Sequence, residues 1–188
     1  MNTPAHLLTG AALFGRKGGE KTLWAATVGS LLPDLSLYLL VFWAFNVQRL
    51  TPDVVFGEQY FSPEWQQIFA IDNSIPLWGL LLGIAIWQRV DWAIALCAAA
   101  LLHIGFDFTM HAGDGRPNFW PLADWIYNSP ISYWDSRHHA HLVAPVTLLG
   151  SLVAFVFLWR HCRWRGRGVF ACLMAAELWT AWQMFTYF

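Results

Sequence analysis

Three residues in one stretch of the sequence have the types and the spacing of a metal site. His103, Asp107 and His111 are each four residues apart, and that spacing places side chains on one face of a helix. Such a face can present imidazole nitrogens and a carboxylate to one divalent ion, or let the carboxylate bridge two ions. A Gly-rich turn at 113–115 follows closely, so a helix could end beyond Asp107. His103 and Asp107 are therefore stronger candidates than His111.

Other ionisable residues lie inside apolar segments at a comparable depth. A charge at the centre of a membrane helix costs about 2.5–3.5 kcal/mol, so it normally has a partner or a function. At about 1.5 Å per helical residue, counted from the nearest basic turn, His6 lies roughly 15 Å deep, Asp34 roughly 20 Å and His103 roughly 18 Å. We expect these residues and Asp107 to form one cluster. Glu177 lies at a similar depth and is expected to support the cluster or join helices.

A second group of histidines opens a later apolar segment. His138, His139 and His141 are further candidate ligands, although histidines at a water boundary need no special function. Arg116 and Arg137 are candidate substrate-binding residues, because a guanidinium group can bind a phosphate through two parallel hydrogen bonds.

The composition is that of a membrane protein rather than a soluble one. The chain has 188 residues, of which 57% are hydrophobic and 12% charged, whereas soluble domains carry about 25% charged residues. This disfavours an ordinary cytosolic protein and a disordered one. The net charge of −1 disfavours a nucleic-acid-binding protein. The three scattered cysteines cannot form a disulfide framework.

The elements that must position these residues are predicted to be helices. No β alternation persists, and several apolar stretches approach the length of about 20 residues that a membrane helix needs. We expect an all-α integral membrane bundle of about five spans plus a short N-terminal helix, in which Thr3 is the N-cap, forming one domain over 1–188. The expected helices are 4–14, 23–45, 75–87, 92–106, 142–159 and 169–188, with longer loops at 46–74 and 107–141.

The distribution of cations predicts the orientation of this bundle. If the spans alternate, eight of the eleven Lys and Arg residues fall in loops on one side: Arg16, Lys17, Lys21, Arg89, Arg160, Arg163, Arg165 and Arg167. The positive-inside rule makes that side cytoplasmic. The candidate site then faces the opposite, outer side.

Four motifs in order resemble those of a known family. They are MNTPAH at 1–6, GSLLPD at 29–34, HIGFD at 103–107 and FWPL at 119–122. In this pattern the chain resembles the LexA-regulated, membrane-bound, predicted metal-dependent hydrolases, and it is more remotely similar to zinc-dependent phospholipase C and the P1-type nucleases. The resemblance covers about residues 1–145. It implies a bacterial inner-membrane protein and the metal ligands His6, Asp34, His103 and Asp107.

The sequence departs from the family pattern at two positions. Ser36 stands where a second Asp is usual, and Asn73 stands where a histidine is usual. Loss of an imidazole lowers zinc affinity, so Asp72 or one of the histidines at 138–141 would have to substitute, or the chain is an inactive relative.

We therefore expect a membrane-bound metal-dependent hydrolase that cleaves a phosphoester of a lipid or another amphiphile. Asp34 and Asp107 are its expected catalytic residues, and the His and carboxylate ligands suit Zn²⁺, with Mn²⁺ as the alternative. Membrane lipid is the expected environment and possible substrate. A proton or metal transporter, a bis-histidine haem or quinone protein, and a non-catalytic scaffold of the same fold are the alternatives. The absence of a visible inverted repeat disfavours the transporter.

Overall fold

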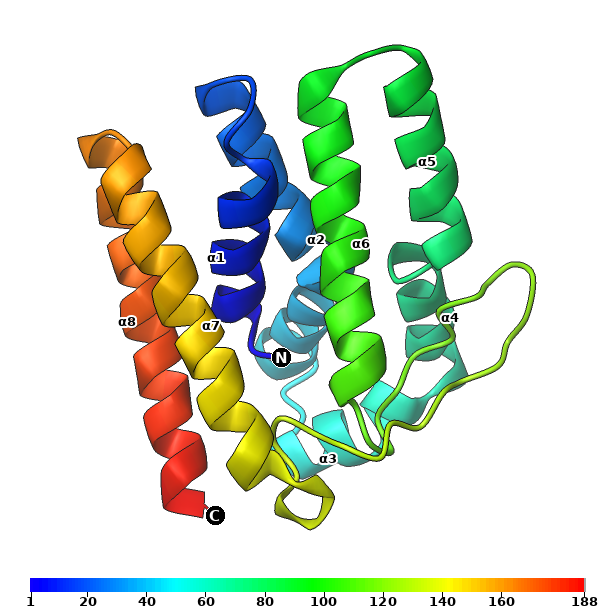
Figure 1. Cartoon of the computed structure of the whole chain (residues 1–188). Helices are drawn as coiled ribbons and strands as arrows, with labels where there is room; N and C mark the ends of the chain where they lie inside the picture. The colour runs from blue at the N-terminus through cyan, green and yellow to red at the C-terminus, as the bar shows by residue number, and fades with distance from the viewer. Residues whose placement is uncertain (188) are drawn as a thin grey trace.

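The structure is a computed structural model that describes residues 1–187, and within this range every regular element is a helix (Figure 1). The all-helical prediction is thereby confirmed. The elements in chain order are α1 (Thr3–Phe14), α2 (Glu20–Asn46), α3 (Pro52–Gly57), the 3₁₀ turn η1 (Gln59–Phe61), α4 (Pro63–Asp72), α5 (Ile75–Trp87), α6 (Asp91–Met110), the 3₁₀ turn η2 (Ser136–His138), α7 (Ala140–His161) and α8 (Trp164–Tyr187).

Four helical stretches in the described range are long and apolar enough to cross a membrane: Glu20–Asn46, Pro63–Trp87, Asp91–Met110 and Ala140–His161. They contain the first four predicted spans. The second of them joins α4 to α5 and is longer than the predicted span 75–87. The fifth predicted span lies in α8, a helix of 24 residues that is not among the four, and Phe188 at its predicted end lies outside the described residues.

The predicted loop at 46–74 is wrong, because most of this segment is helical. α3, η1 and α4 pack against the end of α2 in a small core formed by Ala44, Val55, Tyr60, Trp65 and Phe69. Proline starts α3 and α4, where its missing N–H would have no helical partner anyway. The Ser62 and Ser74 hydroxyls accept N-terminal amide hydrogen bonds of α4 and α5.

The helix α1 is surrounded by other helices. It contacts α2, α6, α7 and α8, and glycines permit the close approach of α1 to α2 and of α2 to α6. A Cβ atom at Gly10 would clash with the Ser30 hydroxyl of α2, and one at Gly29 would clash with the Leu96 carbonyl of α6. These contacts hold α1, α2 and α6 close enough for their polar side chains to meet.

The N-cap of α1 differs from the prediction. Asn2 occupies the N-cap position, and the Thr3 hydroxyl instead donates a hydrogen bond to Asp34 Oδ2 at 2.6 Å. The side chain of Thr3 therefore joins α1 to α2.

The bundle has two different ends (Figure 1). The turns between α1 and α2, α5 and α6, and α7 and α8 lie together at one end, and most of the Lys and Arg residues lie in these turns or in the helix ends next to them. The segment 47–62 and the loop 111–139 lie at the other end. Alternation of the spans predicted this grouping.

Candidate metal centre

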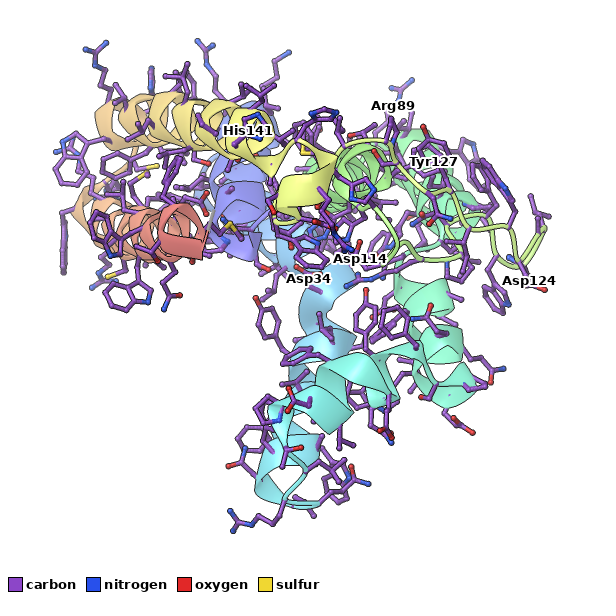
Figure 2. All side chains as sticks on the ribbon, turned by 90° about the horizontal axis from the view of Figure 1, so that it is seen from below. Asp34, Arg89, Asp114, Asp124, Tyr127 and His141 are labelled. Atoms are coloured by element: carbon purple, nitrogen blue, oxygen red, sulfur yellow. The ribbon has the colours of Figure 1, made fainter. Side chains whose placement is uncertain are left out.

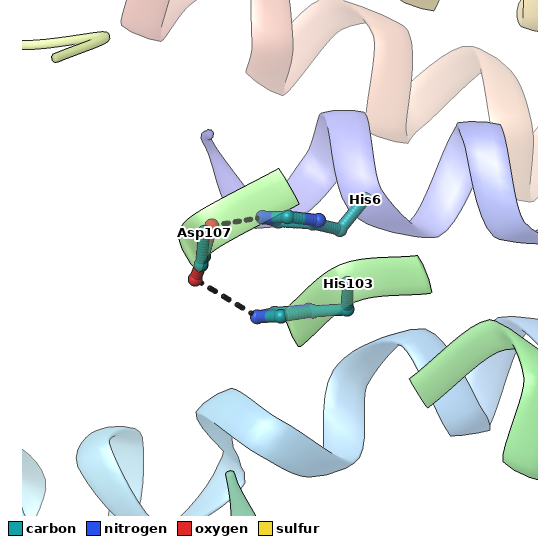
Figure 3. Close-up of side chains that lie close together, drawn as sticks. All are labelled: His6, His103 and Asp107. Atoms are coloured by element: carbon teal, nitrogen blue, oxygen red, sulfur yellow. Dashed lines mark hydrogen bonds and ion pairs between the residues drawn. The ribbon is translucent and has the colours of Figure 1, made fainter. Parts of the chain in front are cut away.

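Side chains from α1, α2 and α6 converge in the interior of the bundle. His6 and His103 are 1% exposed, Asp34 is 6% exposed and Asp107 is 8% exposed. His6 Nε2 lies 2.8 Å from Asp107 Oδ1, and His103 Nε2 lies 3.2 Å from Asp107 Oδ2 (Figure 3). Asp34 Oδ1 lies 3.6 Å from His103 Nε2. The four residues predicted from depth therefore form one cluster.

The tautomer of His103 is fixed by the backbone of α2. Its Nδ1–H donates a hydrogen bond to the Ser30 carbonyl at 2.7 Å, so Nε2 is the atom that faces Asp34 and Asp107. An unprotonated nitrogen would present its lone pair to two carboxylates, which is repulsive. A positive charge at this place, either a second proton on His103 or a metal ion, makes the arrangement favourable.

The distances between these atoms fit a metal site. Ligand atoms about 2.0–2.1 Å from a tetrahedral zinc ion lie about 3.3 Å from one another. The separations of 3.2 Å and 3.6 Å from His103 Nε2 to the two carboxylates are of this size. One ligand atom each from His6, His103 and Asp107 lies within 4.8 Å of the others. The donor set of imidazole and carboxylate suits Zn²⁺ or Mn²⁺.

His111 lies at the edge of the cluster although α6 has ended by then. It is the C-cap of α6, and its Nε2 is 3.5 Å from Asp107 Oδ2. Its Nδ1–H donates to Asp114 Oδ2 at 2.9 Å. Burial alone would lower the pKa of His111, but the carboxylates of Asp107 and Asp114 raise it above its usual value. The short distance to Asp107 Oδ2 makes His111 a further residue that could bind an ion held by this cluster.

Arg116 adds a buried cation to the cluster. Its Nη2 lies 3.3 Å from Asp34 Oδ1, and its Nη1 donates to the Pro33 carbonyl and to Asn73 Oδ1. The guanidinium also lies over the Phe69 ring at 5.1 Å. Burial opposes its charge, but Tyr60 and Asp34 nearby raise its pKa above the ordinary value. Its Nε has no hydrogen-bond partner among the described residues.

The amino group of Met1 is a second cation in contact with the cluster. It donates to Asp107 Oδ1 at 2.7 Å and is almost fully buried. Each carboxylate therefore already has one positive partner, Arg116 for Asp34 and Met1 for Asp107. Asp107 Oδ2, which faces His103 and His111, is the oxygen without such a partner.

A cavity of about 570 Å³ leads to this cluster. Asp34, Asp107, His111, Asp114 and Arg116 lie on its polar side. The rest of its wall is mainly apolar and aromatic, from α2, α3, η1 and the loop before α7: Leu37, Tyr38, Val41, Phe56, Tyr60, Phe61, Tyr133 and Trp134. The cavity can hold a molecule that has a polar or anionic group and an apolar portion.

Four predicted site residues lie elsewhere. His138 is half exposed and its Nδ1–H donates to Asp135, and the exposed Arg137 also pairs with Asp135. His139 and His141 are exposed, with ring centroids 6.3 Å apart. Figure 2 shows His141 on α7, away from Asp34 and Asp114, which line the same cavity. None of the four lines that cavity.

Sequence reasoning missed two parts of the site. Asp114, which orients His111, lies in a turn that appeared to be only a helix terminator, although its spacing of three from His111 was a usable signal. Asn73 was interpreted as a lost ligand, but its amide holds Arg116 and donates to the Pro33 carbonyl. Nothing in the local sequence indicates that role.

Comparisons with protein-family models, curated proteins and solved structures found no match to this chain.

Proposed function

We propose that this chain is an integral membrane, metal-dependent hydrolase that cleaves a phosphoester of a lipid or another amphiphile. The observation that carries the proposal is the convergence of His6, Asp34, His103 and Asp107 beside Arg116, at a cavity whose other walls are apolar. A divalent ion is what such a ligand set binds, and an amphiphile is what such a cavity accommodates.

Membrane insertion is supported by the surface of the bundle. The four long apolar stretches expose many large hydrophobic side chains, among them Leu39, Phe42, Val146 and Val153. An exposed apolar surface of this kind is unfavourable in water and favourable in a bilayer. We propose that α8 also crosses, that the cation-bearing turns face the cytoplasm and that the cavity faces the outer side of a bacterial inner membrane.

The chemistry assigns separate tasks to the residues. A bound Zn²⁺ or Mn²⁺ would supply an activated water and neutralise charge on the phosphoryl group. His6, His103, Asp34 and Asp107 would hold the ion, and the Ser30 carbonyl keeps His103 in the tautomer that leaves Nε2 free to bind it. Arg116 brings a fixed positive charge to the polar side of the cavity, where a phosphate would bind. The apolar wall orients the rest of the substrate and excludes water.

Metal analysis of the purified full-length protein tests the proposal. We expect stoichiometric zinc or manganese in the wild type and in a His139→Ala/His141→Ala control, which removes two histidines outside the cluster. We expect a loss of more than about tenfold in metal affinity for His103→Ala/Asp107→Ala, since even residues that only support ligands contribute 10–100-fold. Equal metal content in all three proteins would refute the proposal.

Activity measurements separate binding from catalysis. The metal-loaded wild type and the control should hydrolyse a fluorogenic phosphodiester and a short-chain phospholipid, and the His103→Ala/Asp107→Ala variant should not. A flux assay in liposomes should show no passage of ions, whereas a transporter would show it.

A catalytically inactive scaffold is the second candidate. It is favoured by the two ion pairs that neutralise Asp34 through Arg116 and Asp107 through Met1 without a metal. In that case the wild type binds no metal, and His103 carries the second proton that its contacts require.

A further inference from the structure

A second cavity lies at the other end of the bundle from the candidate metal centre. Its volume is about 410 Å³, and it lies between the α1–α2 turn and the α7–α8 turn. Its inner wall is apolar and closed, because Ala11 and Leu158 are buried there and Trp24 stacks on the buried Phe170. A ligand in this cavity would enter from the end of the bundle.

The charged residues around this cavity are mostly positive. Arg16, Arg163 and Arg165 line it, and Glu20 is its only carboxylate among the described residues. The nearest ion pair, from Arg163 Nη1 to Glu20 Oε1, is 3.8 Å long and more than half exposed on both sides. Exposed pairs of this kind contribute little. The cavity therefore has an uncompensated positive charge, to which the N-terminal ends of α2 and α8 add.

The surroundings of the cavity match the level of lipid headgroups. Trp164 is 75% exposed beside the cavity and lies 5.3 Å from the Arg165 guanidinium, and Arg16 lies 6.0 Å from the Phe157 ring. Exposed Trp and Arg at the ends of apolar helices are typical of the boundary between bilayer and water. Basic pockets between membrane helices on the cytoplasmic side bind the phosphate of anionic lipid headgroups.

We infer that this cavity, which we call the basic cavity, binds the phosphate of an anionic phospholipid, with Arg16, Arg163 and Arg165 as the residues that recognise it. The lipid headgroup lies among the three arginines, and the acyl chain of the lipid lies against Leu23 and Phe157. The site lies in the leaflet opposite the candidate metal centre. The inference rests on the proposed membrane insertion and is independent of the proposed hydrolase activity.

The test uses the purified full-length protein in a neutral detergent, with phosphatidylglycerol or phosphatidylcholine of the same chain length added. Bound lipid is measured by native mass spectrometry, and the unfolding midpoint is measured in parallel. The cavity variant is Arg163→Gln/Arg165→Gln. The matched control is Lys17→Gln/Arg89→Gln, which removes the same charge from the same end of the bundle but does not line the basic cavity. Inorganic phosphate alone is the third addition.

We expect phosphatidylglycerol, and not phosphatidylcholine, to bind and to raise the unfolding midpoint of the wild type and the control. The cavity variant should bind it at least about tenfold more weakly, since each cation near a headgroup contributes a factor of about five. If the cavity variant loses helix content, the single variant Arg16→Gln replaces it. If the cavity variant and the control lose phosphatidylglycerol binding equally, the lipid is attracted only by the general positive charge at this end of the bundle, and the inference is overturned. Saturable protection by inorganic phosphate, equal to that by the lipid, would overturn the lipid as the ligand.

Discussion

The imidazole rings of His6 and His103 stack almost parallel, with centroids 3.6 Å apart and planes inclined by 13°. Their Nε2 atoms point to different oxygens of the same carboxylate, that of Asp107. Two protonated rings in this arrangement would repel each other. In the proposed metal site, a single dication held by both histidines would remove the repulsion and would link α1 to α6.

The first prediction follows from this link. Because a metal ion would bind only the assembled cluster, its removal should destabilise the fold. At a free metal concentration about 100 times the dissociation constant, binding adds about 2.7 kcal/mol to the free energy of unfolding. We expect a chelator to lower the unfolding midpoint of the wild type, with recovery on addition of Zn²⁺. The His103→Ala/Asp107→Ala variant should show neither change, and a chelator effect of the same size in that variant would contradict the prediction.

The second prediction concerns the buried pair of Asp34 and Arg116, whose side chains are 9% and 6% exposed. Arg116→Gln leaves the carboxylate without its cation, which costs about 3–5 kcal/mol for a buried pair. The neutral double variant Asp34→Asn/Arg116→Gln should recover most of that loss. Denaturant unfolding of the wild type, both single variants and the double variant gives the coupling energy. Additive effects of the two substitutions would show that the pair does not interact.

A third prediction uses the close approach of α2 to α6. Gly29→Ala places a Cβ atom against the Leu96 carbonyl and should separate the two helices, at a cost of about 1–3 kcal/mol. Metal affinity should fall as well, because Asp34 lies on α2 and His103 lies on α6. The control is Gly105→Ala, which meets no atom within 4 Å and should be neutral or stabilising by up to about 1 kcal/mol. Unchanged metal content in Gly29→Ala would mean that this packing does not set the site.

The fourth prediction is a pH dependence in the loop before α7. The Arg137 side chain and backbone amide donate hydrogen bonds to the Asp135 carboxylate, and these lower the pKa of Asp135. A carboxyl whose pKa is lower in the folded state stabilises the fold above its unfolded value of about 3.9, and this contribution is lost as the pH falls toward the folded value. The protection factor of the Arg137 amide, which compares its exchange rate with the intrinsic rate at the same pH, should therefore be high at neutral pH and fall in acid.

Arg137→Gln should weaken this dependence without changing phosphoester hydrolysis, because Arg137 does not line the cavity beside the metal centre. If Arg137→Gln lowered turnover as much as Arg116→Gln does, Arg137 would be a substrate-binding residue after all.

The sequence was sufficient for the centre of the site but not for its surroundings. Depth counted along each helix predicted that His6, Asp34, His103 and Asp107 would meet, because a helix has a fixed rise per residue and the turns fix the starting level. It gave no information about rotation around each helix axis. His138, His139 and His141 were placed at the water boundary, outside the depth argument, and their side chains lie outside the cavity.

The helices α3 and α4, at 52–57 and 63–72, were missed for a different reason. α3 and α4 are short, and their apolar residues are buried against the end of α2 rather than arranged as a span. Short helices are stabilised mainly by tertiary packing, which a local pattern does not report. The prolines at the starts of α3 and α4 were the available signals.

The shortness of α1 has a consequence for the architecture of the bundle. With 12 residues, α1 is about 18 Å long, whereas the 27-residue α2 beside it is about 40 Å long. Because α1 covers only part of the length of α2, space remains beside α2 at the N-terminal end of α1. Four residues at this end line the cavity next to the candidate metal centre: Met1, Asn2, Thr3 and Pro4. The length of α1 thus helps to set the volume that is available to a ligand in this cavity.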